Sequence, residues 1–188
     1  MFKLRVKKFV LQFLSVFLII WGAASFFVFP TLQFVQIAIV VLSVSAIILL
    51  LFKRSGYFGF IITIFTNIYA LYGILFTYGL PVWSVMLLLV VIFAFCFYTN
   101  FHNLFGNHFI IYLSLFLILN LEIFLTLSYY LVNPMTRSLI MVIFSHLFYG
   151  YMTSIDEKNV LDVKNLYSYI YSASIILIFL FLTISWGR

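Results

Sequence analysis

Long apolar runs separated by short polar connections follow one another along the whole chain. They cover residues 9–29, 32–52, 57–78, 81–98, 109–131, 134–152 and 166–186. Most are near the ~20 residues that an α-helix needs to cross a hydrocarbon core of ~30 Å. Helices are expected because backbone polar groups in lipid must be bonded within the segment. The pattern predicts an all-α, polytopic transmembrane helical bundle of seven spans, with residues 1–188 forming a single integral membrane domain.

The stretch 109–152 is expected to hold two of these spans. One continuous helix over it would be about 66 Å long, roughly twice the thickness of the hydrocarbon core. The chain must therefore reverse. Asn133 is a favoured N-cap and Pro134 a favoured first helical residue, so we predict that the returning helix begins there.

The first run has features of both a signal peptide and a retained anchor. Basic residues within 1–8 precede it, and Gly22-Ala23-Ala24 resembles a cleavage site. Cleavage there would leave six spans. The run continues to Phe29 at full transmembrane length, however, which favours a retained helix.

Charge indicates how the chain is threaded. The formal net charge is +6, but the basic residues are scattered at segment ends and form no basic face, so we expect no nucleic acid partner. With the N-terminus in the cytoplasm, Arg137 and Arg188 lie outside. The basic residues on the cytoplasmic side are then Lys3, Arg5, Lys7, Lys8, Lys53, Arg54, Lys158 and Lys164. The positive-inside rule favours this orientation. We expect a multi-pass protein of the cell (plasma or inner) membrane.

Composition narrows the class of protein further. Apolar residues make up 66% of the chain and charged residues 7%, which leaves too little polar surface for a soluble globule of this size. The lipid bilayer is thus the expected surrounding. Cys96 is the single cysteine, which excludes an internal disulfide. Three scattered histidines make a poor ligand set, so we expect no metal and no cofactor.

Glu122 is the candidate centre of function, because it is the carboxylate that lies inside an apolar run. An ionisable group in that setting is costly and is by default a functional hypothesis. Thr126 and Tyr129 follow it at i+4 and i+7 and share its helix face. We expect this stripe to face protein.

His146 is the expected partner of Glu122. Counted from the turn near Asn133, the two side chains differ in depth by about 5 Å, whereas Arg137 lies about 9 Å above Glu122. Arg137 is therefore expected to extend to the headgroups, as an interface anchor together with Trp83 and Trp186.

Ser43 and Asn67 are predicted at a similar depth, roughly 18 Å below their own turns. With Glu122 and His146 they would form one polar layer. This layer can be interpreted as a proton relay or small-cation site. It can also be interpreted as interhelical hydrogen bonding with no transport role.

These observations lead to a ranked set of functional hypotheses. The first is a non-catalytic membrane assembly or accessory protein, binding a second copy of itself or another membrane protein. The alternative is a proton- or cation-coupled carrier of small solutes that uses Glu122 and His146. A lipid-modifying enzyme comes third, because no complete catalytic set is visible. Residues 166–186 contain no lysine for a Schiff base, which excludes a retinal protein.

Overall fold

The structure is a computed structural model that describes residues 2–52, 56–101, 108–130, 133–155 and 161–183. Within these ranges the chain is all-α, with seven helices. They are α1 (Phe2–Val28), α2 (Gln33–Leu51), α3 (Gly56–Tyr78), α4 (Val82–Phe101), α5 (Phe109–Tyr129), α6 (Pro134–Thr153) and α7 (Val163–Thr183). The predicted helices are thus all present. The largest difference is at α1, which begins at Phe2 and so includes the basic residues before the apolar run.

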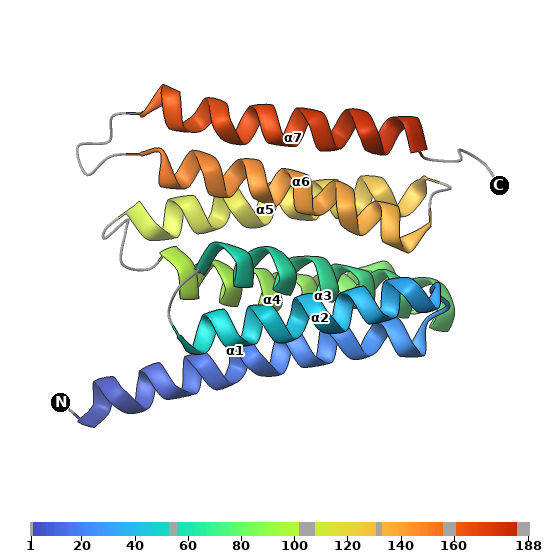
Figure 1. The fold of residues 1–188 in the computed structure, drawn as a ribbon, viewed down its shortest axis with the longest axis horizontal. Coiled ribbons are helices and arrows are strands. Elements are labelled where there is room, and N and C mark those ends of the chain that lie inside the picture. Colours follow the sequence, from blue (N-terminus) through green and yellow to red (C-terminus); the bar gives the residue numbers. More distant parts are fainter. Residues whose placement is uncertain (1, 53–55, 102–107, 131–132, 156–160, 184–188) are drawn as a thin grey trace.

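The helices run back and forth along one common direction (Figure 1), and α1 begins at the opposite end of the bundle from the end at which α7 finishes. Pro30, Pro81 and Pro134 all fall at the end where α1, α3 and α5 finish. We call it the proline end. Sequential helices are therefore antiparallel neighbours, as short connections require.

Local signals define two turns at the proline end. Asn133 caps α6, because its side chain accepts a 2.8 Å hydrogen bond from the backbone N–H of Thr136, and Pro134 opens the helix. This confirms the predicted start of α6. Gly79 follows α3 with φ of 62°, the left-handed conformation that commonly ends a helix and that glycine adopts without steric cost.

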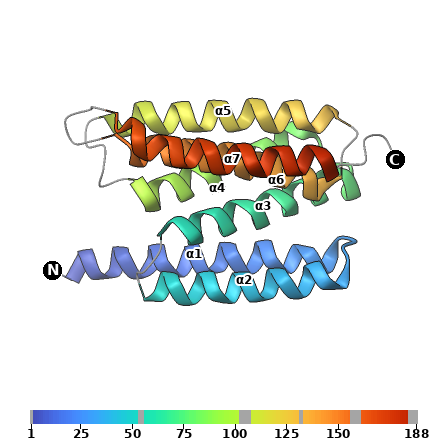
Figure 2. The same cartoon turned by 45° about the horizontal axis from the view of Figure 1, so that its top comes forward.

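The third helix is the centre of the bundle. α3 contacts α1, α2, α4 and α6, and most of its length is buried. α5 packs on α4 and α6, while α7 packs on the other side of α6. Figure 2 shows α1 and α2 as a pair on one side of α3 and α5 at the opposite edge of the bundle. Four helices thus pack directly on α3, whereas α5 is attached mainly through α4 and α6, and α7 mainly through α6.

Aromatic rings fill the interior between α3, α4, α5 and α6. Phe116 of α5 lies 5.3 Å from Phe97, 5.4 Å from Phe93 and 4.9 Å from Phe148 between ring centroids. Nearer the proline end, Phe124 stacks on Tyr72 at 4.4 Å. Lipid tails are as apolar as these side chains, so the packing of large rigid rings, and not burial from water, selects which helix faces meet.

Two glycines allow a helix to approach an aromatic ring of its neighbour closely. A Cβ at Gly150 of α6 would overlap the ring of Tyr169 on α7, and one at Gly73 of α3 would overlap the ring of Phe29 on α1. Small residues are used in this way at membrane helix interfaces. Both positions therefore depend on the absence of a side chain.

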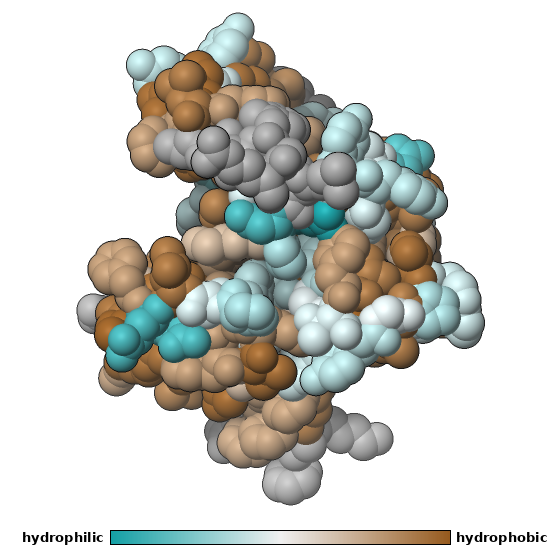
Figure 3. Space-filling model, turned by 90° about the vertical axis from the view of Figure 1, so that its right-hand side faces the viewer, coloured by the Kyte–Doolittle hydropathy of each residue, from teal (hydrophilic) through white to brown (hydrophobic). Residues whose placement is uncertain are grey.

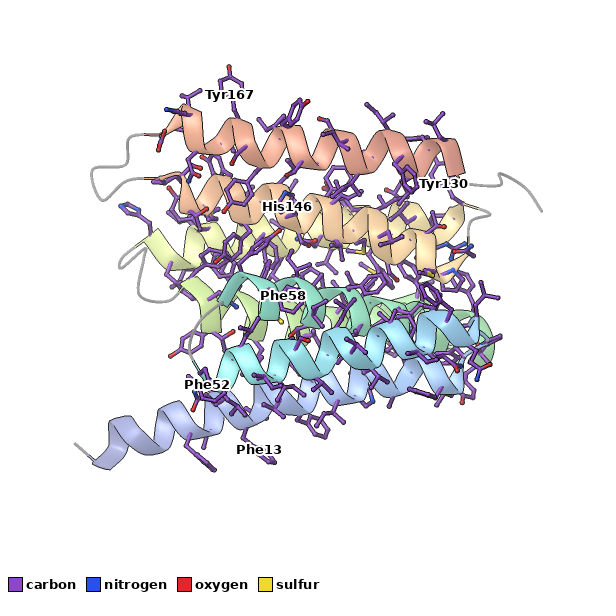
Figure 4. The ribbon with its side chains drawn as sticks, in the orientation of Figure 1. Phe13, Phe52, Phe58, Tyr130, His146 and Tyr167 are labelled. Atoms are coloured by element: carbon purple, nitrogen blue, oxygen red, sulfur yellow. The ribbon has the colours of Figure 1, made fainter. Side chains whose placement is uncertain are left out.

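Six helices in the described ranges, α1 to α5 and α7, have the length and hydropathy of a membrane span. Their outward faces are apolar, and the labelled side chains of Phe13, Phe52 and Tyr167 project away from the bundle (Figure 4). The chain is a multi-pass membrane protein. α6 falls outside this group because it is less apolar than the others, and it packs against α3, α5 and α7.

Candidate functional site

Glu122 lies on the exposed face of α5. Thr126 and Tyr129 lie on the same face, as predicted, and Tyr129 is 78% exposed. The hydroxyl of Thr126 donates to the backbone carbonyl of Glu122 at 2.7 Å, and no described residue donates a hydrogen bond to the Glu122 carboxylate. The stripe therefore does not face the interior of the bundle, as contact with His146 would require.

The opposite face of α5 decides this orientation. Its buried residues are Phe116, Asn120, Phe124 and Leu127, spaced so that they form one helical stripe. Glu122 is two residues from Asn120 and from Phe124, which places it about 200° around the helix from each. Because the phenylalanines pack against α3, α4 and α6, the carboxylate must point outward.

His146 hydrogen-bonds to two other helices and not to α5. Its Nδ1 lies 2.5 Å from the hydroxyl of Tyr57 on α3, and its Nε2 lies 2.8 Å from the hydroxyl of Ser172 on α7. The hydroxyl of Ser172 also donates to the backbone carbonyl of Tyr169 at 3.0 Å. Figure 4 shows His146 within the bundle between these helices. The expected Glu122–His146 pair is therefore not formed.

Tyrosine rings surround this histidine. Tyr169 lies 5.1 Å from the imidazole between ring centroids, and Tyr57 lies 5.7 Å from it. Tyr149 packs edge-on against Tyr57 at 4.9 Å. With both ring nitrogens hydrogen-bonded and aromatic rings on its sides, His146 joins α3, α6 and α7.

Ser43 and Asn67 are buried, but they do not complete a polar layer. The Asn67 amide donates to the backbone carbonyl of Leu18 on α1 at 3.1 Å and to that of Thr63 at 2.7 Å. The side-chain oxygen of Asn67 and the hydroxyl of Ser43 have no hydrogen-bond partner among the described residues. The side chains of Ser43 and Asn67 therefore do not meet Glu122 or His146.

Arg137 is enclosed by neighbouring helices at the proline end of the bundle. It is 5% exposed, its Nη2 donates to the backbone carbonyl of Tyr130, and its Cζ lies 4.0 Å from the centroid of the Phe76 ring. The side chain is therefore packed between helices and does not extend outward as predicted. Trp83 is 66% exposed in the first turn of α4, whereas Trp186 lies outside the described residues.

Sequence reasoning missed the polar contact that does join α5 and α6. The hydroxyl of Ser145 donates to the side-chain oxygen of Asn120 at 3.2 Å, and both residues are buried. The signal was available, because Asn120 lies between Phe116 and Phe124 at i+4 and i−4. Asn120 shares the buried face of α5 with these two aromatic residues, whereas Glu122 does not.

Two cavities lie beside α1 and α3. One, of about 250 Å³, is at the end away from the prolines and includes Gln12, Thr63 and Cys96 in its lining. The other, of about 600 Å³, is at the proline end between Phe29 and Pro134, where Figure 3 shows the surface hollowed on one side. The described lining residues of both include no carboxylate, histidine, lysine or arginine.

No group of three or more His, Cys, Asp or Glu side chains that could hold a metal ion occurs in the described ranges. No protein-family model matches the sequence. Comparison with curated proteins gives no match, and comparison with solved structures gives none. The arrangement of the residues therefore carries the functional argument by itself.

Proposed function

We propose that this multi-pass membrane protein is a non-catalytic assembly or accessory protein that docks a transmembrane helix of another protein on the outer face of α5. The observation that carries the proposal is the exposed Glu122 with Thr126 and Tyr129 beside it. We define these three residues as the α5 stripe.

The depth of Glu122 makes lipid an unfavourable neighbour. It lies seven residues before the end of α5 at Tyr129, which is about 10 Å along the axis. A carboxylate near the bilayer centre costs a few kcal/mol or more. A partner helix that supplies a hydrogen-bond donor or a cation at this depth removes much of that cost.

The surface around the stripe has room for such a helix. α5 packs against α4 and α6, and Figure 2 shows it at the edge of the bundle. A groove of about 380 Å³ runs along part of the stripe. It is lined by Leu125, Thr126, Tyr129 and Tyr130. Towards the other end of α5, Ile118 and Ile111 continue the exposed face, at 54% and 64%.

The chemistry favours a different protein over a second copy. Two copies related by a twofold axis through their α5 helices would place Glu122 of one near Glu122 of the other. Like charges that are close together in a medium of low dielectric repel. A helix that presents lysine, arginine, histidine or a neutral donor complements the carboxylate instead.

Site-specific photo-crosslinking in native membranes tests the proposal. A photoreactive phenylalanine analogue replaces Ile118 on α5 or, as the control, Val91 on α4. Val91 is 66% exposed, and both positions lie nine residues into their helices. We expect a discrete adduct with one other protein from position 118, lost in Glu122→Leu, and no such adduct from position 91.

Sequencing of the crosslinked peptide identifies the partner helix, and we expect it to carry a cationic or hydrogen-bond-donating side chain at the depth of Glu122. An entirely apolar helix at that depth, or an adduct that persists in Glu122→Leu, would contradict the role of the carboxylate. An adduct between two copies of this chain would contradict a separate partner. Equal labelling from positions 118 and 91 would remove α5 as a docking face.

The carrier hypothesis depended on contact between Glu122 and His146, and that contact is not formed.

We also infer that all seven helices cross the membrane and that the N-terminus is cytoplasmic. α6 is as long as α4 and runs beside the other helices (Figure 1). Its Ser145 and His146 hydrogen-bond to α3, α5 and α7.

A further inference from the structure

Arg137 in the first turn of α6 lies between the last turns of α3 and α5, at the proline end. Its guanidinium covers the ring of Phe76, with Cζ 4.0 Å from the centroid, and lies 5.4 Å from the ring of Tyr72. Nη2 donates to the carbonyl of Tyr130, which ends α5. These contacts use one of the three guanidinium nitrogens as a hydrogen-bond donor.

The other two nitrogens are buried without an acceptor. Neither Nε nor Nη1 of Arg137 has a hydrogen-bond partner among the described residues. The arginine side chain as a whole is only 5% exposed. A buried donor that lacks an acceptor is costly, and a buried charge that lacks a counter-charge is costlier still.

The surroundings offset only part of this charge. Aromatic faces and one carbonyl attract a cation, but none of them carries a full negative charge. Arg137 also stands in the first turn of α6, where the helix dipole favours anions. A water molecule could accept from Nε or Nη1, but it would leave the net charge unbalanced.

We propose that Arg137 binds a phosphate group at the proline end of the bundle, from a phospholipid headgroup or free in solution. Arginine donates well to phosphate oxygens. The end of the bundle is level with an interface, because Trp83, Tyr129 and Tyr130 are exposed there and such side chains favour the headgroup layer. Figure 3 shows hydrophilic residues gathered near the middle of this end.

Binding is measured on the full chain purified in a phosphate-free, uncharged detergent. One arm titrates inorganic phosphate and the other titrates phosphatidylglycerol, with native mass spectrometry and the thermal unfolding midpoint as readouts. Arg137→Met removes the charge at similar length. Lys164→Met is the matched control, because it removes one positive charge from an exposed position at the opposite end of the bundle.

We expect phosphatidylglycerol, inorganic phosphate or both to bind the unaltered protein and raise its unfolding midpoint. Arg137→Met should weaken this binding at least tenfold, while Lys164→Met should leave it within twofold. A response to the lipid alone identifies a headgroup as the source, and a response to inorganic phosphate alone identifies the free anion. No response to either, or equal binding by Arg137→Met, overturns the proposal.

A second measurement avoids altering Arg137 in case the methionine variant does not fold. Lysine replaces the arginines at positions 5, 54 and 188, so that Arg137 is the only arginine left. After labelling with guanidino-¹⁵N arginine, its Nε and Nη resonances are followed by NMR. They should shift on addition of the ligand found above, and resonances that stay unchanged at saturation overturn the assignment.

Discussion

The hydroxyl of Tyr57 lies 2.5 Å from Nδ1 of His146, and this contact joins the first turn of α3 to the middle of α6. On the other side of the imidazole, Ser172 extends the connection to α7. α7 packs on the bundle through α6. The histidine is thus placed to hold the outermost helix and the central helix in a fixed relation.

Replacement of Tyr57 by phenylalanine should lower the free energy of unfolding modestly. The change removes a hydroxyl and keeps the ring that packs on Tyr149. Hydrogen bonds between membrane helices contribute about 0.6 kcal/mol on average and up to ~1.7 kcal/mol. Unfolding by dodecyl sulfate in mixed micelles measures the difference. Tyr167→Phe, an exposed position on α7, is the control, and an equal loss in both variants would contradict a specific Tyr57–His146 bond.

A pair of double-mutant cycles distinguishes the contact that is formed from the one that sequence reasoning expected. Asn120 and Ser145 should show a coupling energy of about 0.6 kcal/mol, because their side chains share a buried hydrogen bond. Glu122 and His146 should show a coupling near zero, because Glu122 points away from the bundle. Alanine at each position and the same unfolding measurement are sufficient. The reverse ranking of the two couplings would mean that α5 is rotated relative to this structure.

Gly150→Ala should separate α6 from α7. The added Cβ would overlap the ring of Tyr169, and overpacking of this kind costs about 1–3 kcal/mol. Gly59→Ala on α3 is the matched control, since its Cβ would meet the nearest side-chain atom, Cδ1 of Leu50, at an ordinary 3.5 Å. Cysteine crosslinking between α6 and α7 would follow the separation. A Gly150→Ala protein as stable as the Gly59→Ala protein would show that Tyr169 can move aside without cost.

A reporter that is active only in the cytoplasm should be silent when it is fused after Arg188. The reason is that seven spans with a cytoplasmic N-terminus place the C-terminus on the far side, as the distribution of basic residues favours. A second reporter that is active only outside the cytoplasm should work at the same position. If the cytoplasmic reporter works instead, α6 does not cross the membrane or the orientation is inverted.

The helices themselves were predictable because each is encoded locally. Apolar length, the Asn133 cap and the proline positions depend on residues that are neighbours in the sequence, and the helices observed agree with them. Rotation of a helix about its axis is different. In a soluble protein, the charge of Glu122 would have marked the side of α5 that faces water. In a bilayer, the lipid outside the helix is as apolar as the packed interior, so this signal is lost. The expectation that Glu122 faces His146 across the bundle therefore chose the wrong side of α5.

The sequence by itself determined that the chain consists of long apolar helices and where each helix lies along the chain, since these follow from the lengths of the apolar runs. Only the tertiary structure decided which side chains meet. Aromatic packing of Phe116 and Phe124 turned Glu122 outward. The approach of α3 and α7 to α6 set the partners of His146, and the rings of Tyr72 and Phe76 lie against Arg137. The physical reason is that helices in a bilayer associate mainly through close packing. That packing depends on the fit between side chains of distant segments, and the sequence of one segment does not show it.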